Sequence, residues 1–291
     1  MLILAFDDYI LQAQRLGVAL GIQVEKVFLH RFPDGESLLR LPIAIPEHVI
    51  ICRSLNQPND KLIELLLCEK TARRLGAKRV TLVAPYLCYM RQDIANQPGE
   101  AISQRIIGQM LAESFDDVIT VDSHLHRISK LTQAIAIENA ISLTAADEIG
   151  RFLKQKFIYA VLLGPDAESE QWVSAIASKI GFDYSVAEKV RQGDKQVTMN
   201  LPDFDFNKKP VVIVDDMAST GRTIAKATKL LKVAGAQQVY VVVTHALFCS
   251  DAEFHIRQAG VKQVWSTDSI GHSSACINLD KLLAGAIKQI L

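Results

Sequence analysis

Short apolar runs alternate with amphipathic segments along most of the chain. Residues 49–52 form one such run, and residues 80–84 form another. Between them, leucine and isoleucine recur at helical spacing over residues 62–75, after Asn59 or Asp60 as a cap and before a glycine. A strand, a helix and a second strand in this order are typical of parallel sheets that helices cover on both faces. The pattern therefore predicts an α/β fold.

The second half of the chain repeats the order of the first. Residues 49–87 and residues 211–248 both contain a strand, a loop, a helix, a Gly-Ala pair and a second strand. Later in each half, the Val-Asp-Ser sequence of residues 121–123 is matched by the Thr-Asp-Ser sequence of residues 267–269. Chance could produce one such match, but several matches in the same order indicate a duplication on the scale of a domain.

The boundary between the halves is expected near Ser142. Thr144 and Asp147 have the spacing of a capped helix start, which would begin the second half. We therefore expect two similar domains, formed by residues 1–142 and 143–291. A chain of 291 residues has room for about two domains of ordinary size.

The composition argues against several classes of protein. Acidic and basic residues number 32 each, whereas a nucleic-acid binder usually carries a basic excess. No apolar run reaches the roughly 18 residues of a membrane span, and residues 1–6 lack the basic leader of a signal peptide. The five cysteines have neither zinc-site nor redox-motif spacing, so free thiols in a cytoplasmic protein are expected.

The sequence after the apolar residues 211–214 carries the most specific chemical signal. Asp215 and Asp216 stand at the carboxyl end of this predicted strand, where α/β sheets place their ligands. A tight turn around Gly221 would direct backbone N–H groups at a helix N-terminus toward one point, which makes an anion site. The carboxylates would repel a phosphate but suit ribose hydroxyls or magnesium. A plain capped helix is the alternative, although two acids before a Thr-Gly-x-Thr turn are unusual for one.

This segment resembles the phosphoribosyl pyrophosphate loop of the phosphoribosyltransferase fold. It implies that ribose 5-phosphate binds to Asp215, Asp216, Ser219, Thr220, Gly221, Arg222 and Thr223. Four further segments narrow the resemblance to the ribose-phosphate pyrophosphokinases, which are also called phosphoribosyl pyrophosphate synthetases. They are Arg31-Phe32-Pro33-Asp34-Gly35-Glu36, Pro58-Asn59-Asp60, Pro85-Tyr86-Leu87-Cys88-Tyr89-Met90-Arg91-Gln92-Asp93 and Asp122-Ser123-His124.

The resemblance implies a fold and a reaction. The fold would be two phosphoribosyltransferase-type domains, each a mainly parallel sheet flanked by helices. The reaction would move the β,γ-pyrophosphoryl group of Mg–ATP to the 1-hydroxyl of ribose 5-phosphate and release AMP. Members of the family are oligomers whose ATP site borrows residues from a neighbouring subunit, so a homo-oligomer, a dimer or a hexamer, is implied.

ATP is assigned by the resemblance to the first half of the chain. The aromatic ring of the Arg31–Glu36 segment would stack on adenine, and its two acids would accept the amino protons of the base. Taken alone, that segment is simply a favourable turn, and Arg91 with Asp93 could be a surface ion pair. The ATP-binding residues that the resemblance implies are Phe32, Asp34, Glu36, Arg91, Gln92 and Asp93.

Metal and catalytic residues are also implied. His124 would lie beside Mg–ATP, although magnesium prefers oxygen ligands and imidazole suits a hydrogen bond to phosphate better. Asp166 would be a carboxylate of a second metal site, and a cap for the helix over residues 172–180 is its alternative role. Lys189 and Arg191 match the catalytic cations of the family, on a segment that could also be a solvated hairpin turn. His30 and His126 have no match and are expected to be packing or surface residues.

The chain departs from the family pattern at three places. Ser219 stands where aspartate is common, residues 94–97 lack the usual basic side chains, and residues 167–170 lack glycines that approach pyrophosphate. The contacts made at these places are therefore expected to differ, including any allosteric anion site built from residues 94–97.

Two other functions compete with this interpretation. A phosphoribosyltransferase consumes the same compound, but it would leave the ATP-type segments unexplained and usually needs only one such domain. A catalytically silent family member could regulate a partner synthetase, but the joint presence of Lys189, Arg191 and His124 argues against that role.

Overall fold

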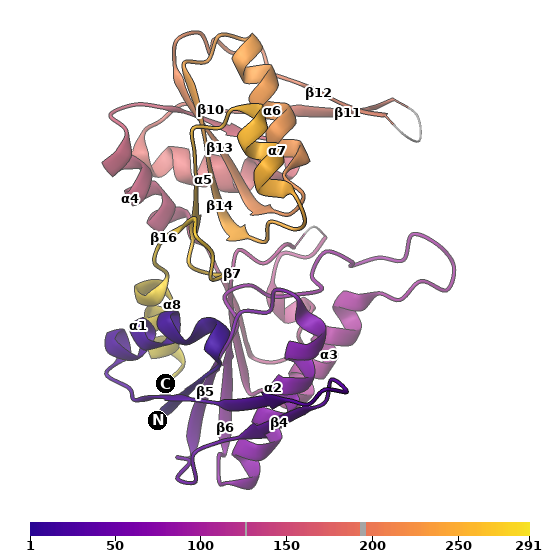
Figure 1. The fold of residues 1–291 in the computed structure, drawn as a ribbon, viewed down its shortest axis with the longest axis vertical. Helices are drawn as coiled ribbons and strands as arrows, with labels where there is room; N and C mark the ends of the chain where they lie inside the picture. The colour runs from indigo at the N-terminus through magenta and orange to yellow at the C-terminus, as the bar shows by residue number, and fades with distance from the viewer. Residues whose placement is uncertain (126, 193–195) are drawn as a thin grey trace. The chain divides into compact units, whose positions relative to one another are not determined.

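The computed structural model describes residues 1–125, 127–192 and 196–291, and for residues 189–198 it describes no side chains. These residues form two compact units, which Figure 1 shows and which are treated separately below. Unit 1 comprises Met1–Thr144, Ser269–Gly271 and Leu279–Leu291. Unit 2 comprises Ala145–Asp268 and His272–Asn278.

Unit 1 is built on a six-stranded parallel sheet with the order β2-β1-β5-β6-β7-β8. Helices α1 and α8 cover one face of it, and α2 and α3 cover the other (Figure 1). A separate antiparallel hairpin of β3 and β4 completes the unit. The bounds are β1 (Leu2–Ala5), α1 (Ile10–Leu20), β2 (Val24–Lys26), β3 (Phe28–Arg31), β4 (Ser37–Arg40), β5 (His48–Cys52), α2 (Pro58–Arg74), β6 (Arg79–Val83), α3 (Ser103–Ser114), β7 (Asp117–Val121), β8 (Asn139–Leu143) and α8 (Asp280–Ile290).

Unit 2 has a six-stranded parallel sheet with the order β10-β9-β13-β14-β15-β16, and a separate antiparallel hairpin of β11 and β12. Helices α4 and α5 lie on one face of the sheet and α6 and α7 on the other (Figure 1). The bounds are α4 (Ala146–Lys156), β9 (Val161–Gly164), α5 (Glu170–Ile180), β10 (Tyr184–Val186), β11 (Glu188–Gln192), β12 (Gln196–Asn200), β13 (Pro210–Ala218), α6 (Arg222–Val233), β14 (Gln238–Ala246), α7 (Ala252–Ala259), β15 (Gln263–Thr267) and β16 (Ala275–Ile277).

The two sheets have the same strand order, so the predicted fold class and the duplication are confirmed. The correspondence extends to single hydrogen bonds. The N–H of Asp122 after β7 donates to the carbonyl of Leu143 at 2.7 Å, and the N–H of Asp268 after β15 donates to that of Ile277 at 2.9 Å. The Asp-Ser pairs that the sequence matched therefore occupy equivalent positions in the two sheets.

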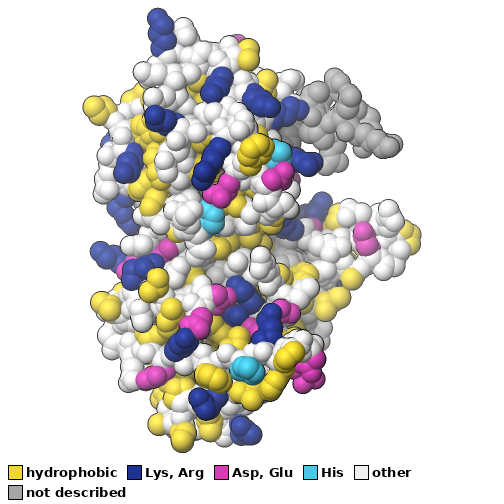
Figure 2. Space-filling view, viewed as in Figure 1, with side chains coloured by type: hydrophobic (Ala, Val, Ile, Leu, Met, Phe, Trp, Pro, Cys, Tyr) yellow, Lys and Arg dark blue, Asp and Glu magenta, His cyan; other side chains and the backbone are white. Residues whose placement is uncertain are grey.

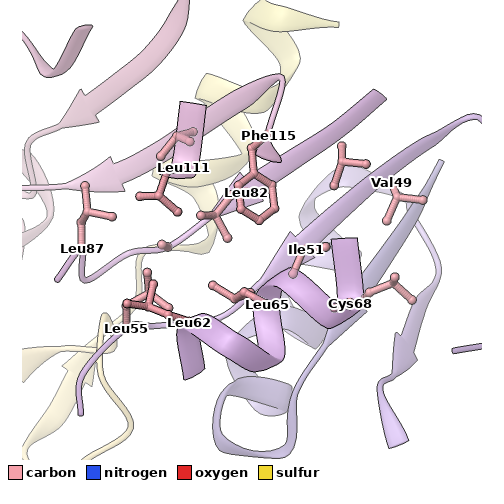
Figure 3. Close-up of a cluster of buried hydrophobic side chains, with 14 of the residues drawn as sticks. Val49, Ile51, Leu55, Leu62, Leu65, Cys68, Leu82, Leu87, Leu111 and Phe115 are labelled. Carbon is pink, nitrogen blue, oxygen red and sulfur yellow. The ribbon is translucent and has the colours of Figure 1, made fainter. Parts of the chain in front are cut away.

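One hydrophobic cluster of unit 1 lies between its sheet and helices α2 and α3. Figure 3 shows Ile51 and Leu82 of neighbouring strands facing Leu65 of α2 and Phe115, which follows α3. Most strand residues are buried on both faces, as expected where helices cover a parallel sheet. Each buried leucine or phenylalanine contributes about 1.5–3 kcal/mol through removal from water. These side chains fix the strand ends from which the functional loops leave.

The C-terminal helix joins unit 1, a feature that the expected division at Ser142 did not include. Leu283 and Ile287 of α8 are buried, and the ammonium of Lys288 donates to the carbonyl of Ala19 in α1 at 3.4 Å. An apolar stripe on a helix must be covered, and in this chain α1 helps to cover it. The boundary near Ser142 itself remains a prediction.

Two predicted helix starts were displaced. Helix α2 begins at Pro58, because proline suits the first helical position, so Asn59 and Asp60 lie inside its first turn. Helix α4 begins at Ala146 rather than with a cap at Thr144, and Asp147 pairs instead with Lys179 at 2.5 Å.

Charges are scattered over the surface of each unit. Figure 2 shows lysine and arginine side chains interspersed with acidic and apolar ones on the described part of the face in view. The five cysteines, all of which the structure describes, form no disulfide. Among the described helices, none combines the length and the apolar character needed to cross a membrane.

A pair of glycine substitutions tests the packing of unit 1. A Cβ at Gly108 in α3 would lie 1.9 Å from the carbonyl oxygen of Ala134, whereas one at Gly285 in α8 would have no neighbour within 4 Å. We expect Gly108→Ala to lower the free energy of unfolding by about 2–3 kcal/mol, despite the helix propensity of alanine. Gly285→Ala, the matched control, should raise it by about 0.5–1 kcal/mol. Equal changes in the free energy of unfolding of the two variants, measured by urea denaturation, would contradict the close contact between Gly108 and Ala134.

Candidate functional site

The sheet of unit 2 reverses its strand order between β9 and β13, which is the place where α/β proteins bind ligands. The chain leaves β9 toward β10 on one side and leaves β13 toward β14 on the other, with α5 and α6 on opposite faces. A crevice forms outside the carboxyl ends of two strands that diverge in this way. Asp166 follows β9, and Asp215 and Asp216 lie in the last part of β13.

Strand β13 is longer than its apolar run predicts and includes both aspartates. Residues that alternate along a strand point to opposite faces, and accordingly Asp216 is buried while Asp215 is half-buried. The Asp216 N–H donates to Asp215 Oδ1 at 3.0 Å. The two carboxyl groups therefore have different surroundings, although they are neighbours in sequence.

Asp215 lies in an electrostatically unfavourable position for a carboxylate. Burial raises its pKa well above the usual range, and the negative charges of Asp216 and Asp166 raise it further. Three acidic groups at the mouth of one crevice favour a cation, or hydroxyl groups that donate hydrogen bonds. This arrangement fits a divalent cation, because magnesium takes one or two carboxylates together with ligand oxygens.

The turn between β13 and α6 requires glycine for two reasons. Gly221 adopts a left-handed conformation with φ of 69° immediately before α6. A Cβ at this residue would also lie 2.8 Å from the carbonyl oxygen of Ala252 and 3.0 Å from the Ile256 side chain. Helix α7 thus packs directly against the turn. The first N–H groups of α6 lack intrahelical acceptors, which makes its N-terminus suitable for an anion.

A short segment after β14 supports the same turn, and sequence reasoning missed it. The N–H groups of Phe248 and Cys249 donate to the carbonyls of Ala218 and Ser219 at 2.8 and 2.9 Å. Ser219 Oγ also lies 3.6 Å from Cys249 Sγ, as donor to the thiol sulfur. Phe248 and Ser250 both have positive φ, which is uncommon outside glycine. Nothing in the local sequence signals these contacts, since the paired residues are about 30 positions apart.

The other predicted ribose 5-phosphate residues surround the turn. Ser219 and Thr223 are half-buried, and Thr220 and Arg222 are exposed. The structure therefore brings together on one turn and one strand end the residues that the sequence assigned to the sugar phosphate.

Asp166 caps a short 3₁₀ turn (Ala167–Ser169) that precedes α5, rather than the helix over residues 172–180 that the sequence offered as its alternative role. Its Oδ1 accepts from the Ser169 N–H at 3.2 Å. The negative charge of the same carboxylate also raises the pKa of Asp215. Asp166 therefore still acts on Asp215 although it caps the turn.

The segment predicted to bind adenine forms the turn of the β3–β4 hairpin in unit 1. The Phe32 N–H donates to the Glu36 carbonyl at 2.8 Å, and the Glu36 N–H donates to Asp34 Oδ1 at 3.2 Å. All three side chains are exposed, and the ring of Phe32 meets that of His30 edge-on at 4.9 Å. The favourable turn that the sequence offers as an alternative is therefore present, with the three predicted side chains available on it.

The residues of the predicted ATP loop have different surroundings. Arg91 is exposed, whereas Asp93 is buried and pairs with Arg127 at 2.6 Å rather than forming the Arg91–Asp93 pair considered from the sequence. Gln92 accepts from Ser103 Oγ at 2.6 Å at the start of α3. Gln92 and Asp93 thus stabilise the loop that carries Arg91.

His124 follows a strained residue at the end of β7. Asp122 is buried with φ of 39°, and Ser123 Oγ bonds Ser142 Oγ at 2.7 Å. His124 is half-buried and belongs to unit 1, whereas Asp166 belongs to unit 2. Within the part of the chain that the structure describes, no cluster of three His, Cys, Asp or Glu side chains could by itself hold a metal ion.

Lys189 and Arg191 lie on β11, opposite Met199 and Val197 of β12. Their backbone lies in a strand of an antiparallel pair rather than in the hairpin turn considered from the sequence, and their side chains lie outside the description. His126 also lies outside the described residues.

Family comparisons cover both units. A family model described as the N-terminal domain of ribose phosphate pyrophosphokinase matches residues 1–114, and one described as a phosphoribosyl transferase domain matches residues 129–261. A ribose-phosphate pyrophosphokinase of Methanopyrus kandleri is 30% identical over 293 residues, covering 100% of this chain and 99% of the relative.

The chain belongs to the ribose-phosphate pyrophosphokinase family. A second family member, from Saccharolobus solfataricus, is 35% identical over 264 residues, covering 88% of this chain and 89% of its own. Among solved structures, phosphoribosylpyrophosphate synthetase from Mycobacterium smegmatis superposes with a TM-score of 0.85 at 22% identity, covering 99% of this chain and 98% of that one. That structure supports the fold of this ribose-phosphate pyrophosphokinase family member.

A charge-removing substitution tests the electrostatics of the crevice. Because its folded-state pKa is raised, Asp215 favours folding below its unfolded pKa of about 3.9 and loses that contribution as pH rises through the raised value. We expect Asp215→Asn to raise Tm by about 2–6 °C at pH 7 and to have no effect near pH 3.5. Asp203→Asn, at an exposed residue, is the control. A Tm difference independent of pH would contradict the raised pKa.

Proposed function

We propose that the chain is a ribose-phosphate diphosphokinase, which transfers the pyrophosphoryl group of ATP to the 1-hydroxyl of ribose 5-phosphate and releases AMP. The observation that carries this proposal is the crevice of unit 2, where Asp166, Asp215 and Asp216 stand beside the turn at Gly221. Acidic groups beside an anion-binding turn match the two ends of a sugar phosphate, one rich in hydroxyls and one a phosphate.

Ribose 5-phosphate would bind with its phosphate at the N-terminus of α6. Backbone N–H groups and the hydroxyls of Ser219, Thr220 and Thr223 would donate to it. Asp215 and Asp216 would accept from the ribose hydroxyls, which keeps them apart from the phosphate. Ser219 supplies no charge where the family resemblance leads us to expect aspartate, so we propose that its hydroxyl serves through hydrogen bonding alone.

Magnesium is the metal that we propose for the reaction. The donor set fits it, since Asp166 and Asp215 offer oxygen ligands and the raised pKa of Asp215 would fall when a cation arrives. When bound with substrate oxygens, magnesium would neutralise charge on the transferred phosphates. His124 would contact the phosphates of ATP, as a hydrogen-bond donor or a metal ligand.

ATP would bind to unit 1. The exposed ring of Phe32 offers a face for adenine, and Asp34 and Glu36 on the same turn would accept its amino protons. Arg91 would contact phosphate oxygens or stack on the base, while Gln92 and Asp93 support its loop.

Lys189 and Arg191 would stabilise the negative charge that develops on the transferred group.

We also propose a cytoplasmic homo-oligomer, a dimer or a hexamer, with the ATP site near a subunit interface. Phe28 and Leu38 on the adenine hairpin are 44% and 43% exposed, which suits contact with a second copy. A silent regulatory member and a phosphoribosyltransferase remain the alternatives.

One assay separates the three functions. The purified protein with Mg–ATP should form AMP only when ribose 5-phosphate is present, and Lys189→Ala should lower that rate by at least about 100-fold. Lys281→Ala, at an exposed residue of α8, should keep the wild-type rate. AMP formation that ignores ribose 5-phosphate, or a fully active Lys189→Ala variant, would refute the proposal.

The turn of the sugar-phosphate site has a matched glycine control. Gly221 and Gly181 have φ of 69° and 68°, but only at Gly221 would a Cβ meet other atoms within 4 Å. Both alanine variants carry a similar backbone cost of about 1–2 kcal/mol. Gly221→Ala should raise the KM for ribose 5-phosphate by about tenfold or more, and Gly181→Ala should leave it unchanged. Similar KM values for ribose 5-phosphate in both variants would show that the turn at Gly221 is not part of the binding site.

A further inference from the structure

A buried carboxylate in unit 1 holds both stems of the β3–β4 hairpin. Glu64 of α2 has a side chain that is only 1% exposed, and its Oε1 accepts two hydrogen bonds. One comes from the Arg31 guanidinium at 3.0 Å and the other from Ser37 Oγ at 3.1 Å. Arg31 is the last residue of β3 and Ser37 is the first of β4. The turn that carries Phe32, Asp34 and Glu36 is therefore anchored at both sides by one oxygen atom.

The second carboxylate oxygen anchors Glu64 to the sheet. Its Oε2 lies 2.7 Å from an Arg53 guanidinium nitrogen, and Arg53 directly follows β5. Arg53 is buried, pairs through Nε with Asp8 at 3.2 Å and lies 4.0 Å above the centre of the Phe6 ring. The hairpin is thus connected through Glu64 to residues at the ends of β1 and β5.

Glu64 is held as an anion. Burial alone would raise its pKa, but hydrogen bonds and positive charge from Arg53 and Arg31, together with the Ser37 hydroxyl, outweigh burial and hold the pKa below its usual value. Charge-assisted hydrogen bonds of this kind are stronger than neutral ones. An isolated two-stranded hairpin is at best marginally stable in water, so this carboxylate supplies order that the hairpin lacks by itself.

The duplicated fold gives this cluster a counterpart. The ends of β1 and β5 in the sheet of unit 1 correspond to the ends of β9 and β13 in unit 2, where the proposed substrate crevice lies. In unit 1 the place is filled by the chain itself. The Lys61 ammonium donates to Asn56 Oδ1 at 2.9 Å and to the Ser54 carbonyl at 2.8 Å, and it pairs with Asp8 at 2.7 Å. The strand-order reversal of unit 2 is therefore the proposed substrate site, whereas that of unit 1 is filled by side chains that support the hairpin.

We propose that Glu64 is a positioning residue for ATP, which fixes the hairpin so that the ring of Phe32 and the carboxylates of Asp34 and Glu36 are set for adenine. This inference rests on the proposed function, because it takes the hairpin as the adenine site. Glu64 is buried behind the hairpin and contacts no substrate; it acts through Arg31 and Ser37.

The decisive variants weaken the contacts between the hairpin and Glu64 and leave the Arg53–Glu64 pair in place. Ser37→Ala removes one hydrogen bond to Glu64, and Arg31→Lys replaces the planar fork by a point charge. Each should raise the KM and the Kd for ATP by about 3–10-fold, with the KM for ribose 5-phosphate and Tm nearly unchanged. Asp60→Asn is the matched control, because Asp60 is the exposed partner of Arg31 at 2.9 Å, and it should shift ATP affinity less than twofold.

A double-variant cycle assigns the effect to the carboxylate. Glu64→Gln should raise the KM for ATP at least as much as Ser37→Ala, because it removes the negative charge that both Arg31 and Ser37 contact. The two substitutions act on one contact, so their effects in the double variant should be less than additive. If Glu64→Gln fails to fold, the two hairpin variants decide. Unchanged ATP affinity in Ser37→Ala and Arg31→Lys, or equal losses for both substrates in step with Tm, would overturn the inference.

The inference and the proposed function can fail separately. Absence of ribose 5-phosphate-dependent AMP formation in the wild type would refute the function, while calorimetric Kd values for ATP would still judge the role of Glu64. A wild-type protein that binds no ATP would overturn both.

Discussion

Each six-stranded sheet in this protein reverses its strand order at one point, and the placement of the candidate site depends on that constraint. Two neighbouring strands send their helices to opposite faces there, so their carboxyl ends are left uncovered. In unit 2 the uncovered ends present Asp166 and Asp215 beside the turn at Gly221. In unit 1 the same position is occupied by Arg53 and its partners. The duplicated fold therefore has two equivalent strand-order reversals, and different side chains line them.

Two carboxylates illustrate how that difference arises. Burial raises the pKa of Asp215 and acts in the same direction on Glu64. The neighbours decide the outcome, because Asp216 and Asp166 add negative charge to the first while Arg53 and Arg31 neutralise the second. Glu64 is consequently a charge-paired structural anion, whereas Asp215 gains from a cation or a hydroxyl donor. An acidic group whose negative charge is not balanced by its own fold is suited to binding a cation or a hydroxyl donor.

Local pattern determined much of the architecture. The apolar runs and the amphipathic segment between them were read correctly as strands and a helix of a duplicated α/β fold, and family resemblance added the identity of the loops. Errors lay at element ends, where tertiary contacts compete with local preference. Asn59 did not cap α2 because Pro58 had already started the helix, and β13 continued through Asp215 and Asp216 because β14 pairs along its whole length.

By itself, the sequence determined the alternation of strands and helices in each half, the Asp-Asp and Thr-Gly-x-Thr signals and the membership of an enzyme family, because these depend on periodicity and on residues close together in the chain. Only the tertiary structure decided that α8 joins unit 1, that Cys249 supports Ser219 and that Glu64 anchors Arg31 and Ser37. Those contacts join residues about 30 or more positions apart, and their stability depends on burial and charge that exist only once the chain has folded.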